Sequence, residues 1–204
     1  MAEGSPGPES SSGHEAASAL QLYRSRRRAI LPLDGSLHVP RSLRRVLHAG
    51  RFELRLNSAF EAVLAGCADR PSTWISGELA AVYRQLHCGG LAHSVEAFDA
   101  EGLAGGLLAI AIGACWIGES MFHRRPHASN VLLVGLVEAL AAGGFLLFDV
   151  QLSNPHLERY GCRELADADY SRLLAAARSR PATLRLSEAR LTSEAWMTES
   201  EWFK

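Results

Sequence analysis

Residues 103–122 read LAGGLLAIAIGACWIGESMF, and this stretch indicates the fold class of the chain. Two apolar runs, 103–112 and 114–120, stand on either side of Gly113. Such runs are typical of strands buried on both faces of a sheet, and a glycine suits the tight turn between them. A membrane span needs roughly 17–25 apolar residues, and the glycines inside this stretch argue against one. We therefore predict two neighbouring antiparallel strands.

A predicted helix and a further strand bring polar side chains beside this pair. The helix covers 128–142 with a broad apolar face, and the apolar run 145–148 after it leads to Asp149 and Gln151. Glu119 lies near the end of the second of the two earlier strands. Because each polar residue follows an apolar segment, a buried sheet would present two carboxylates and an amide at one edge.

The rest of the chain alternates short strands and helices. Ser58 and Glu61 have the spacing of a capping box, and Ser76 and Asn154 are predicted N-caps. We expect a strand over 29–31, a helix over 40–48, a strand over 51–56, a helix from 58 to about 67, a helix from 76 to 89, an extended segment over 93–98, a short helix after 154 and a last helix over 167–178. This order favours a mixed α/β (α+β) sheet with helices on both faces.

Composition indicates a globular protein with enough apolar residues for a sizeable core. The 204 residues are 48% hydrophobic and 21% charged, and the formal net charge of -1 names no partner. The four cysteines form no C-x-x-C pair, which favours free thiols in a reducing compartment. Residues 1–18 lack the apolar core of a signal peptide. We expect a cytoplasmic protein without a membrane segment.

Positive charge is concentrated in one part of the chain. Residues 21–55 hold nine arginines against only two acidic residues. Such asymmetry fits a polyanionic partner such as a nucleic acid, and it fits a solvated basic face equally well. Charge alone leaves both interpretations open.

Six short motifs carry a resemblance to a known family. They are Thr73-Trp74-Ile75, Ala92-His93-Ser94-Val95-Glu96, Gly105-Gly106, Gly118-Glu119-Ser120-Met121-Phe122, Ala128-Ser129 and Asp149-x-Gln151. In this order and spacing the set resembles the leucyl/phenylalanyl-tRNA–protein transferases, from about Arg27 to Leu174. The resemblance implies an acetyltransferase-like (GNAT-type) catalytic domain. It also implies transfer of Leu, Phe or Met from aminoacyl-tRNA to an N-terminal Arg or Lys, which marks the acceptor for N-degron degradation.

The resemblance assigns roles to the three polar residues. It implies that Asp149 and Gln151 lie at the attack site and that Glu119 lies beside the aminoacyl ester or the acceptor amine. Aminolysis of an ester requires positioning, proton removal and stabilisation of an oxyanion, with no covalent nucleophile. We therefore expect no cofactor. Without the resemblance, a helix cap or an ion pair would be the more common role for a lone carboxylate after a strand.

The resemblance also names two groups of binding residues. An apolar pocket for the aminoacyl side chain corresponds to Leu107, Trp116, Met121, Leu133, Leu136 and Phe148, positions that equally suit an ordinary core. The bulk of Trp116 predicts a preference for Leu over Phe. Contacts to the tRNA correspond to Arg41, Arg44 and Arg45 for its body and to Trp74 for its 3′ adenosine, since arginines fork onto phosphates and aromatic faces stack on bases.

These assignments divide the chain into four parts. We expect a disordered tail over 1–20, a short basic subdomain over 21–70, the catalytic domain over 71–180 and a C-terminal tail over 181–204. The basic subdomain is reduced relative to the longer N-terminal domain usual in the family, which leaves its effect on tRNA binding open. We expect a monomer.

Two alternatives and one metal hypothesis accompany this interpretation. An acyl-coenzyme A enzyme would carry a Q/R-x-x-G-x-G/A loop, which does not occur here. A non-catalytic relative would bind tRNA or N-terminal peptides, but Glu119, Asp149 and Gln151 together argue against it. His123 and His127 have the spacing of a helical metal pair, yet Pro126 breaks a helix there, so we expect no metal.

Overall fold

The computed structural model describes residues 27–186. The expectations for residues 1–20 and for the tail from residue 187 onward lie outside this range. The described elements are β1 (Arg27–Leu31), α1 (Arg41–His48), β2 (Glu53–Leu56), α2 (Phe60–Ala68), α3 (Gly77–Cys88), β3 (Ala92–Asp99), β4 (Gly102–Ile112), β5 (Cys115–His123), α4 (Ala128–Ala142), β6 (Leu147–Gln151), α5 (Pro155–Glu158), β7 (Arg163–Ala166) and α6 (Asp167–Arg178).

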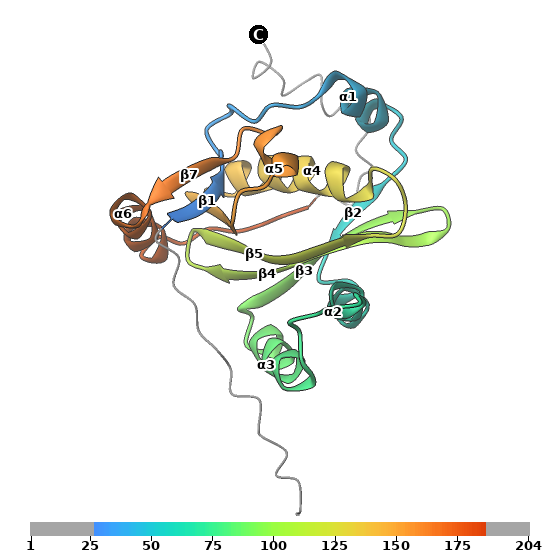
Figure 1. Cartoon of the computed structure of the whole chain (residues 1–204), viewed down its shortest axis with the longest axis horizontal. Helices are drawn as coiled ribbons and strands as arrows, with labels where there is room; N and C mark the ends of the chain where they lie inside the picture. The colour runs from blue at the N-terminus through green and yellow to red at the C-terminus, as the bar shows by residue number, and fades with distance from the viewer. Residues whose placement is uncertain (1–26, 187–204) are drawn as a thin grey trace, which may run out of the picture.

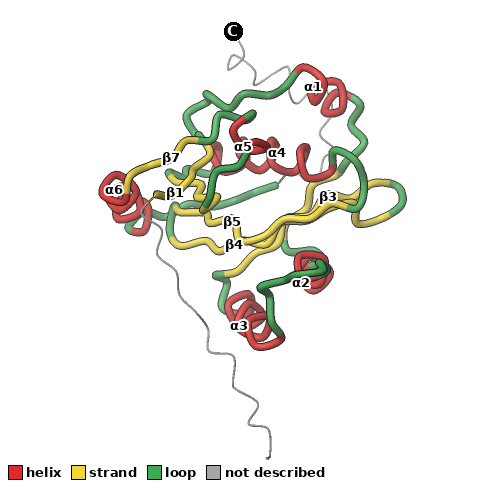
Figure 2. The backbone as a smooth tube through the Cα atoms, viewed as in Figure 1, coloured by secondary structure: helices red, strands yellow, loops and turns green. Residues whose placement is uncertain are grey.

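Seven strands form one mixed sheet in the order β2-β3-β4-β5-β6-β1-β7 (Figures 1 and 2). Neighbouring strands are antiparallel except β5 and β6, which are parallel and are joined by α4. The predicted mixed α/β sheet flanked by helices is confirmed. Strands β1 and β2 come from the basic segment 21–70, so that segment contributes to both halves of the same sheet.

Helices cover both faces of the sheet (Figure 1). On one face α4 packs on β3, β4 and β5, and α1 packs on α4. On the other face α2 packs on β3, β4 and β5, with α3 beside it on β3. Alternation along β4 follows this division: Leu107 and Ala109 belong to the main core cluster under α4, whereas Leu108 belongs to the cluster under α2 and α3.

A third apolar cluster lies under α6, which packs on β1, β5, β6 and β7. Ile117 on β5 contacts this cluster, and its partner on β4, Ile110, contacts the cluster under α2 and α3. Residues that pair directly across antiparallel strands share a face of the sheet. The α2–α3 cluster and the α6 cluster therefore lie side by side on the same face.

The start of α2 differs from the predicted capping box. Ser58 does not cap the helix; its Oγ donates to Glu96 at 3.0 Å, and the backbone N–H groups of Ser58 and Ala59 donate to the same carboxylate at 3.3 and 3.2 Å. Ser94 Oγ is a fourth donor to Glu96, which is fully buried. A carboxylate from the sheet thus satisfies the free N–H groups before α2, a role that local spacing assigned to Glu61.

Two predicted helix caps agree with the structure, and two strands differ from their prediction. Ser76 and Asn154 are confirmed as N-caps, accepting from Leu79 and from His156 and Leu157 respectively. Strand β5 runs on to His123, so the motif 118–122 lies within the strand. The short edge strand β7 was not predicted, because Arg163-Glu164-Leu165-Ala166 has neither alternation nor β-branched residues.

Candidate active site

Two irregularities in the sheet distinguish β5 and β6 where their pairing ends. The parallel pairs between these strands stop at Ile117 and Asp149. Between β4 and β5, Ala109 pairs with Gly118 and Leu108 with Ser120, so Glu119 is the extra residue of a bulge. Between β1 and β6, Ile30 pairs with Asp149 and Ala29 with Gln151, so Val150 is the extra residue of a second bulge. Bulges redirect side chains, and they are common beside active sites.

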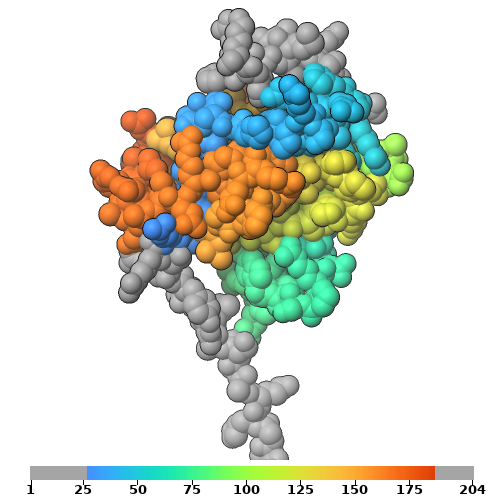
Figure 3. All heavy atoms as spheres, turned by 45° about the horizontal axis from the view of Figure 1, so that its top comes forward, coloured from blue at the N-terminus to red at the C-terminus, as the bar shows by residue number. Residues whose placement is uncertain are grey.

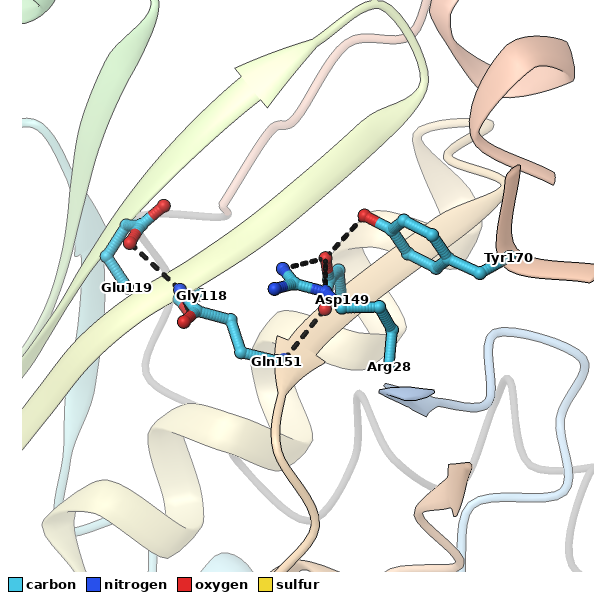
Figure 4. Close-up of polar contacts among 6 residues, drawn as sticks. All are labelled: Arg28, Gly118, Glu119, Asp149, Gln151 and Tyr170. Carbon is cyan, nitrogen blue, oxygen red and sulfur yellow. Dashed lines mark hydrogen bonds and ion pairs between the residues drawn. The ribbon is translucent and has the colours of Figure 1, made fainter. Parts of the chain in front are cut away.

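Gln151 connects the two strands across the point where their pairing ends (Figure 4). Its side-chain Nε2 donates to Glu119 Oε2 at 2.9 Å and to the backbone oxygen of Gly118 at 3.3 Å. Its backbone N–H donates to Asp149 Oδ1 at 2.7 Å, with φ at +67°. Such a φ is uncommon for a residue with a side chain and persists only where surrounding contacts maintain it.

Asp149 is fully buried and is surrounded by donors. Arg28 donates to Oδ2 from Nε at 3.1 Å and from Nη2 at 2.5 Å, and Tyr170 Oη donates to the same oxygen at 2.6 Å (Figure 4). Burial lowers the pKa of Arg28, but the interactions with Asp149 and Tyr170 together outweigh burial and raise that pKa overall. Burial, then Asp149, raises the pKa of the Tyr170 phenol. An ion pair and a neutral donor thus compensate the buried charge.

Glu119 interacts with Tyr83 of α3 as well as with Gln151. Burial raises the pKa of Glu119, whereas its hydrogen bonds with Gln151 and Tyr83 lower it. Burial and Glu119 together raise the pKa of the Tyr83 phenol, which therefore remains a donor. Trp74 meets the Tyr83 ring edge-on at 6.3 Å and is 51% exposed. A row of contacts thus runs from Trp74 through Tyr83 and Glu119 to Gln151.

A second arginine contacts the site, along β5. Arg70, in the loop between α2 and α3, donates from Nη2 to the backbone oxygen of Met121 at 2.6 Å and to Ser120 Oγ at 3.4 Å. These contacts hold the loop that carries Trp74 against the strand that carries Glu119. The loop and the strand therefore form one side of the site.

Comparisons with known proteins show the family of this chain. The sequence profile of the family "Leucyl/phenylalanyl-tRNA protein transferase" matches residues 30–175. The chain belongs to this family. Proteins named "Leucyl/phenylalanyl-tRNA--protein transferase" are similar to it: one from Synechococcus sp. (strain JA-3-3Ab) is 51% identical over 78% of this chain and 83% of the relative, and one from Rubrobacter xylanophilus is 54% identical over 76% and 82%.

The match leaves less than a fifth of each of these relatives outside it. A solved structure of "a functionally unknown conserved protein" from Staphylococcus epidermidis is 8% identical, covers 69% of this chain and 57% of its own, and has a TM-score of 0.42. That likeness is too small to support an argument about this member of the transferase family.

In this transferase, the six apolar residues predicted for the aminoacyl pocket lie in or against the main core. Leu107, Trp116, Leu133, Leu136 and Phe148 are at most 4% exposed, and Met121 is partly buried against the same cluster. Leu107 pairs with Met121, and Trp116 with Phe148. The Trp116 ring stacks on His93, and its indole N–H has no hydrogen-bond partner within residues 27–186. The assignment of these six apolar residues to an aminoacyl pocket stays a prediction.

The arginines predicted to contact tRNA lie on α1. Leu43 and Leu47 are buried, whereas Arg41, Arg44 and Arg45 are exposed, so the arginines lie on the solvent face of this helix. Figure 3 shows the segment of α1 (blue) on the surface of the transferase. Their contact with tRNA stays a prediction.

The sequence raised the questions of a metal pair at His123 and His127 and of a membrane-spanning segment. His123 ends β5 and His127 precedes α4 with φ at +70°, so the two do not share a helix. Within residues 27–186, no three His, Cys, Asp or Glu side chains gather in a way that could hold a metal ion. No helix in the same range has both the length and the apolar character needed to span a membrane.

Sequence reasoning did not identify three residues that the transferase fold brings to the site. Tyr83 lies in the helix predicted from 76 to 89, Arg28 in the basic segment and Tyr170 in the last predicted helix, 167–178. The one available signal is Tyr83, because a tyrosine within an apolar face needs a partner for its hydroxyl group. Arg28 and Tyr170 give no such signal without the sheet order.

Proposed function

We propose that this chain transfers Leu, and also Phe or Met, from aminoacyl-tRNA to the N-terminal Arg or Lys of acceptor proteins, which marks them for N-degron degradation. The observation that carries the proposal is the family match over residues 30–175. The matched range contains Glu119, Asp149 and Gln151, and Gln151 contacts both carboxylates. An arrangement of two carboxylates and one amide fits aminolysis, which needs no nucleophile–base pair.

The reaction forms one amide bond and breaks one ester bond. The acceptor amine attacks the ester carbonyl carbon, the amine loses a proton, and the ribose oxygen leaves with a proton. Gln151 uses its Nε2 on Glu119 and Gly118, so its Oε1 is the atom suited to accept an N–H of the amine. Glu119 would orient this amide and balance positive charge on the amine. These roles would accelerate the reaction by positioning and electrostatics.

The binding roles of the remaining residues belong to the same proposal. The exposed face of Trp74 would stack on the 3′ adenosine, since Trp74 contacts Tyr83, which in turn contacts Glu119. The six apolar residues named above would receive the aminoacyl side chain. The bulk of Trp116 among them supports Leu over Phe.

The proposal is tested by offering purified protein radiolabelled leucyl-tRNA or phenylalanyl-tRNA and two peptides that differ only in an N-terminal Arg or Ala. We expect label on the Arg peptide alone, with leucyl-tRNA the better donor. Equal transfer of Leu and Phe would remove the assigned effect of Trp116. Binding of tRNA without transfer would favour a non-catalytic relative.

Replacing Asp149 by Ala should lower turnover by about 100-fold or more, because Gln151 loses the carboxylate that holds its backbone. The dissociation constant for leucyl-tRNA should change by less than about twofold. Asp169→Ala, an exposed aspartate on α6, is the matched control and should change neither quantity. If Asp149→Ala weakened binding and turnover in parallel, Asp149 would have a structural role only.

A further inference from the structure

Arg28 and Tyr170 reach Asp149 from two other elements of the fold. Arg28 lies on β1, 121 positions from Asp149, and Tyr170 lies on α6, 21 positions away. The Arg28 guanidinium also lies 5.5 Å from the centre of the Tyr170 ring (Figure 4). The two side chains therefore contact each other as well as the carboxylate, and the proposed reaction gives neither of them a role.

The donors around Asp149 occupy both of its oxygens. Oδ2 accepts from Arg28 and Tyr170, and Oδ1 accepts from the backbone N–H of Gln151. Each contact comes from an N–H or O–H donor, and the side chain is fully buried. A carboxylate surrounded in this way is suited to hold its donors in place, and it has little capacity to receive a proton from an amine.

The direction of the Gln151 side chain depends on the position of Asp149. Gln151 sits beside a bulge with φ at +67°, and the hydrogen bond to Asp149 Oδ1 fixes its backbone there. From that backbone position its Nε2 reaches Glu119 and Gly118. If Asp149 moved, the amide would lose the orientation that the transfer reaction requires.

We propose that Arg28 and Tyr170 are positioning residues of the transfer reaction: they hold Asp149, which holds the backbone of Gln151 and directs its amide to Glu119. The inference rests on the proposed function and adds two residues to it. The raised pKa values of Arg28 and Tyr170 support it, because both groups then remain donors at neutral pH. Arg28 compensates Asp149 here and is separate from the arginines of α1.

The first test compares Tyr170→Phe and Arg28→Lys with Arg27→Ala, a control on the same strand whose exposed side chain pairs with Glu164. We expect kcat to fall about tenfold in the first two variants, since each loses hydrogen bonding to a charged group. The KM for leucyl-tRNA should stay within about twofold, and Arg27→Ala should keep both constants. A loss of kcat that only matches a loss of folded, tRNA-binding protein would overturn the inference.

A double-mutant cycle tests whether the effect passes through Asp149. In an Asp149→Asn background, Tyr170→Phe should lower kcat by less than about twofold, because the interaction that it removes no longer holds a carboxylate. The same tenfold loss in both backgrounds would mean that Tyr170 acts independently, which would overturn the inference.

A spectroscopic measurement separates this inference from the proposed function. The ¹⁵N–¹H signals of the Gln151 side-chain amide are identified by their loss in Gln151→Glu. They should shift in Tyr170→Phe and Arg28→Lys and should stay unchanged in Arg27→Ala. Unshifted signals in the first two variants would overturn the inference whether or not transfer occurs. An absence of transfer by the wild-type protein would overturn the proposed function. The amide signals would still show whether Arg28 and Tyr170 position Gln151 through Asp149.

Discussion

Glu119 shows how a single residue combines an unfavourable environment with directed contacts. Burial raises its pKa, and hydrogen bonds from Gln151 and Tyr83 offset part of that effect. The bulge on β5 is what gives this residue its position, because it interrupts the pairing of Glu119 with β4. A carboxylate that is partly desolvated and still hydrogen-bonded interacts more strongly with a cationic amine than a solvated one does.

The raised pKa of Glu119 predicts a pH dependence of stability. Between its ordinary value of 4.5 and its higher folded value, the folded state binds more protons than the unfolded state, so stability falls as pH rises. Glu119→Gln keeps an acceptor for Gln151 but does not titrate. The free energy of unfolding of the wild type relative to this variant should therefore decrease from pH 4.5 upward. Urea unfolding at several pH values measures it, and a difference independent of pH would contradict the assigned burial effect.

At the scale of elements, glycines explain how α2 lies against the sheet. A Cβ on Gly106 of β4 would stand 2.7 Å from Val63 Cγ2 and 2.9 Å from Phe122 Cε1. A Cβ on Gly66 of α2 would stand 2.5 Å from the same Phe122 ring. The Gly105-Gly106 motif therefore has a packing role at its second position.

Gly106→Ala should lower the free energy of unfolding by about 1–3 kcal/mol, because an extra methyl group must displace Val63 or the Phe122 ring. Gly77→Ala in the first turn of α3 is the control, since a Cβ there meets no atom within 4 Å. It should leave stability unchanged or raise it by up to about 1 kcal/mol. Thermal and urea unfolding measure both variants, and equal effects would contradict the packing argument.

At the scale of the whole molecule, the sheet joins the basic segment to the site. Strand β1 lies between β6 and β7, so Arg28 reaches Asp149, whereas α1 carries its arginines on the surface beyond α4. One arginine of this segment therefore compensates a buried carboxylate, whereas Arg41, Arg44 and Arg45 of α1 are exposed. Charge counting along the sequence did not distinguish these two groups.

Replacing Arg41, Arg44 and Arg45 together by Ala should weaken tRNA binding and make it less dependent on salt. Loss of three phosphate contacts reduces the slope of log K against log salt concentration by roughly 2–3. A triple replacement of the exposed Arg159, Arg172 and Arg178 makes the same change in charge elsewhere and is the control. Filter binding at several salt concentrations measures both. If the two triple variants behaved alike, α1 would have no specific part in tRNA binding.

Much of the fold could be predicted because the spacing of apolar residues and the identity of cap residues depend only on neighbours in the sequence. The strands on either side of Gly113, the helix 128–142 and the N-caps Ser76 and Asn154 follow from patterns within a few residues. Where a distant group replaced a local one, prediction was wrong, as at Ser58, whose hydroxyl group bonds Glu96 of β3. Such a contact is encoded by sheet pairing and has no local signal.

The sequence by itself determined most of the elements, the fold class and the family, because hydrophobic period and an ordered set of motifs are properties of the chain alone; the edge strand β7 is the exception among the strands. Only the tertiary structure decided the sheet order, the end of β5–β6 pairing at Asp149 and the contacts of Arg28 and Tyr170 with that carboxylate. The physical reason is that strand order and register depend on contacts between residues far apart in the chain, whereas period and capping depend on neighbours.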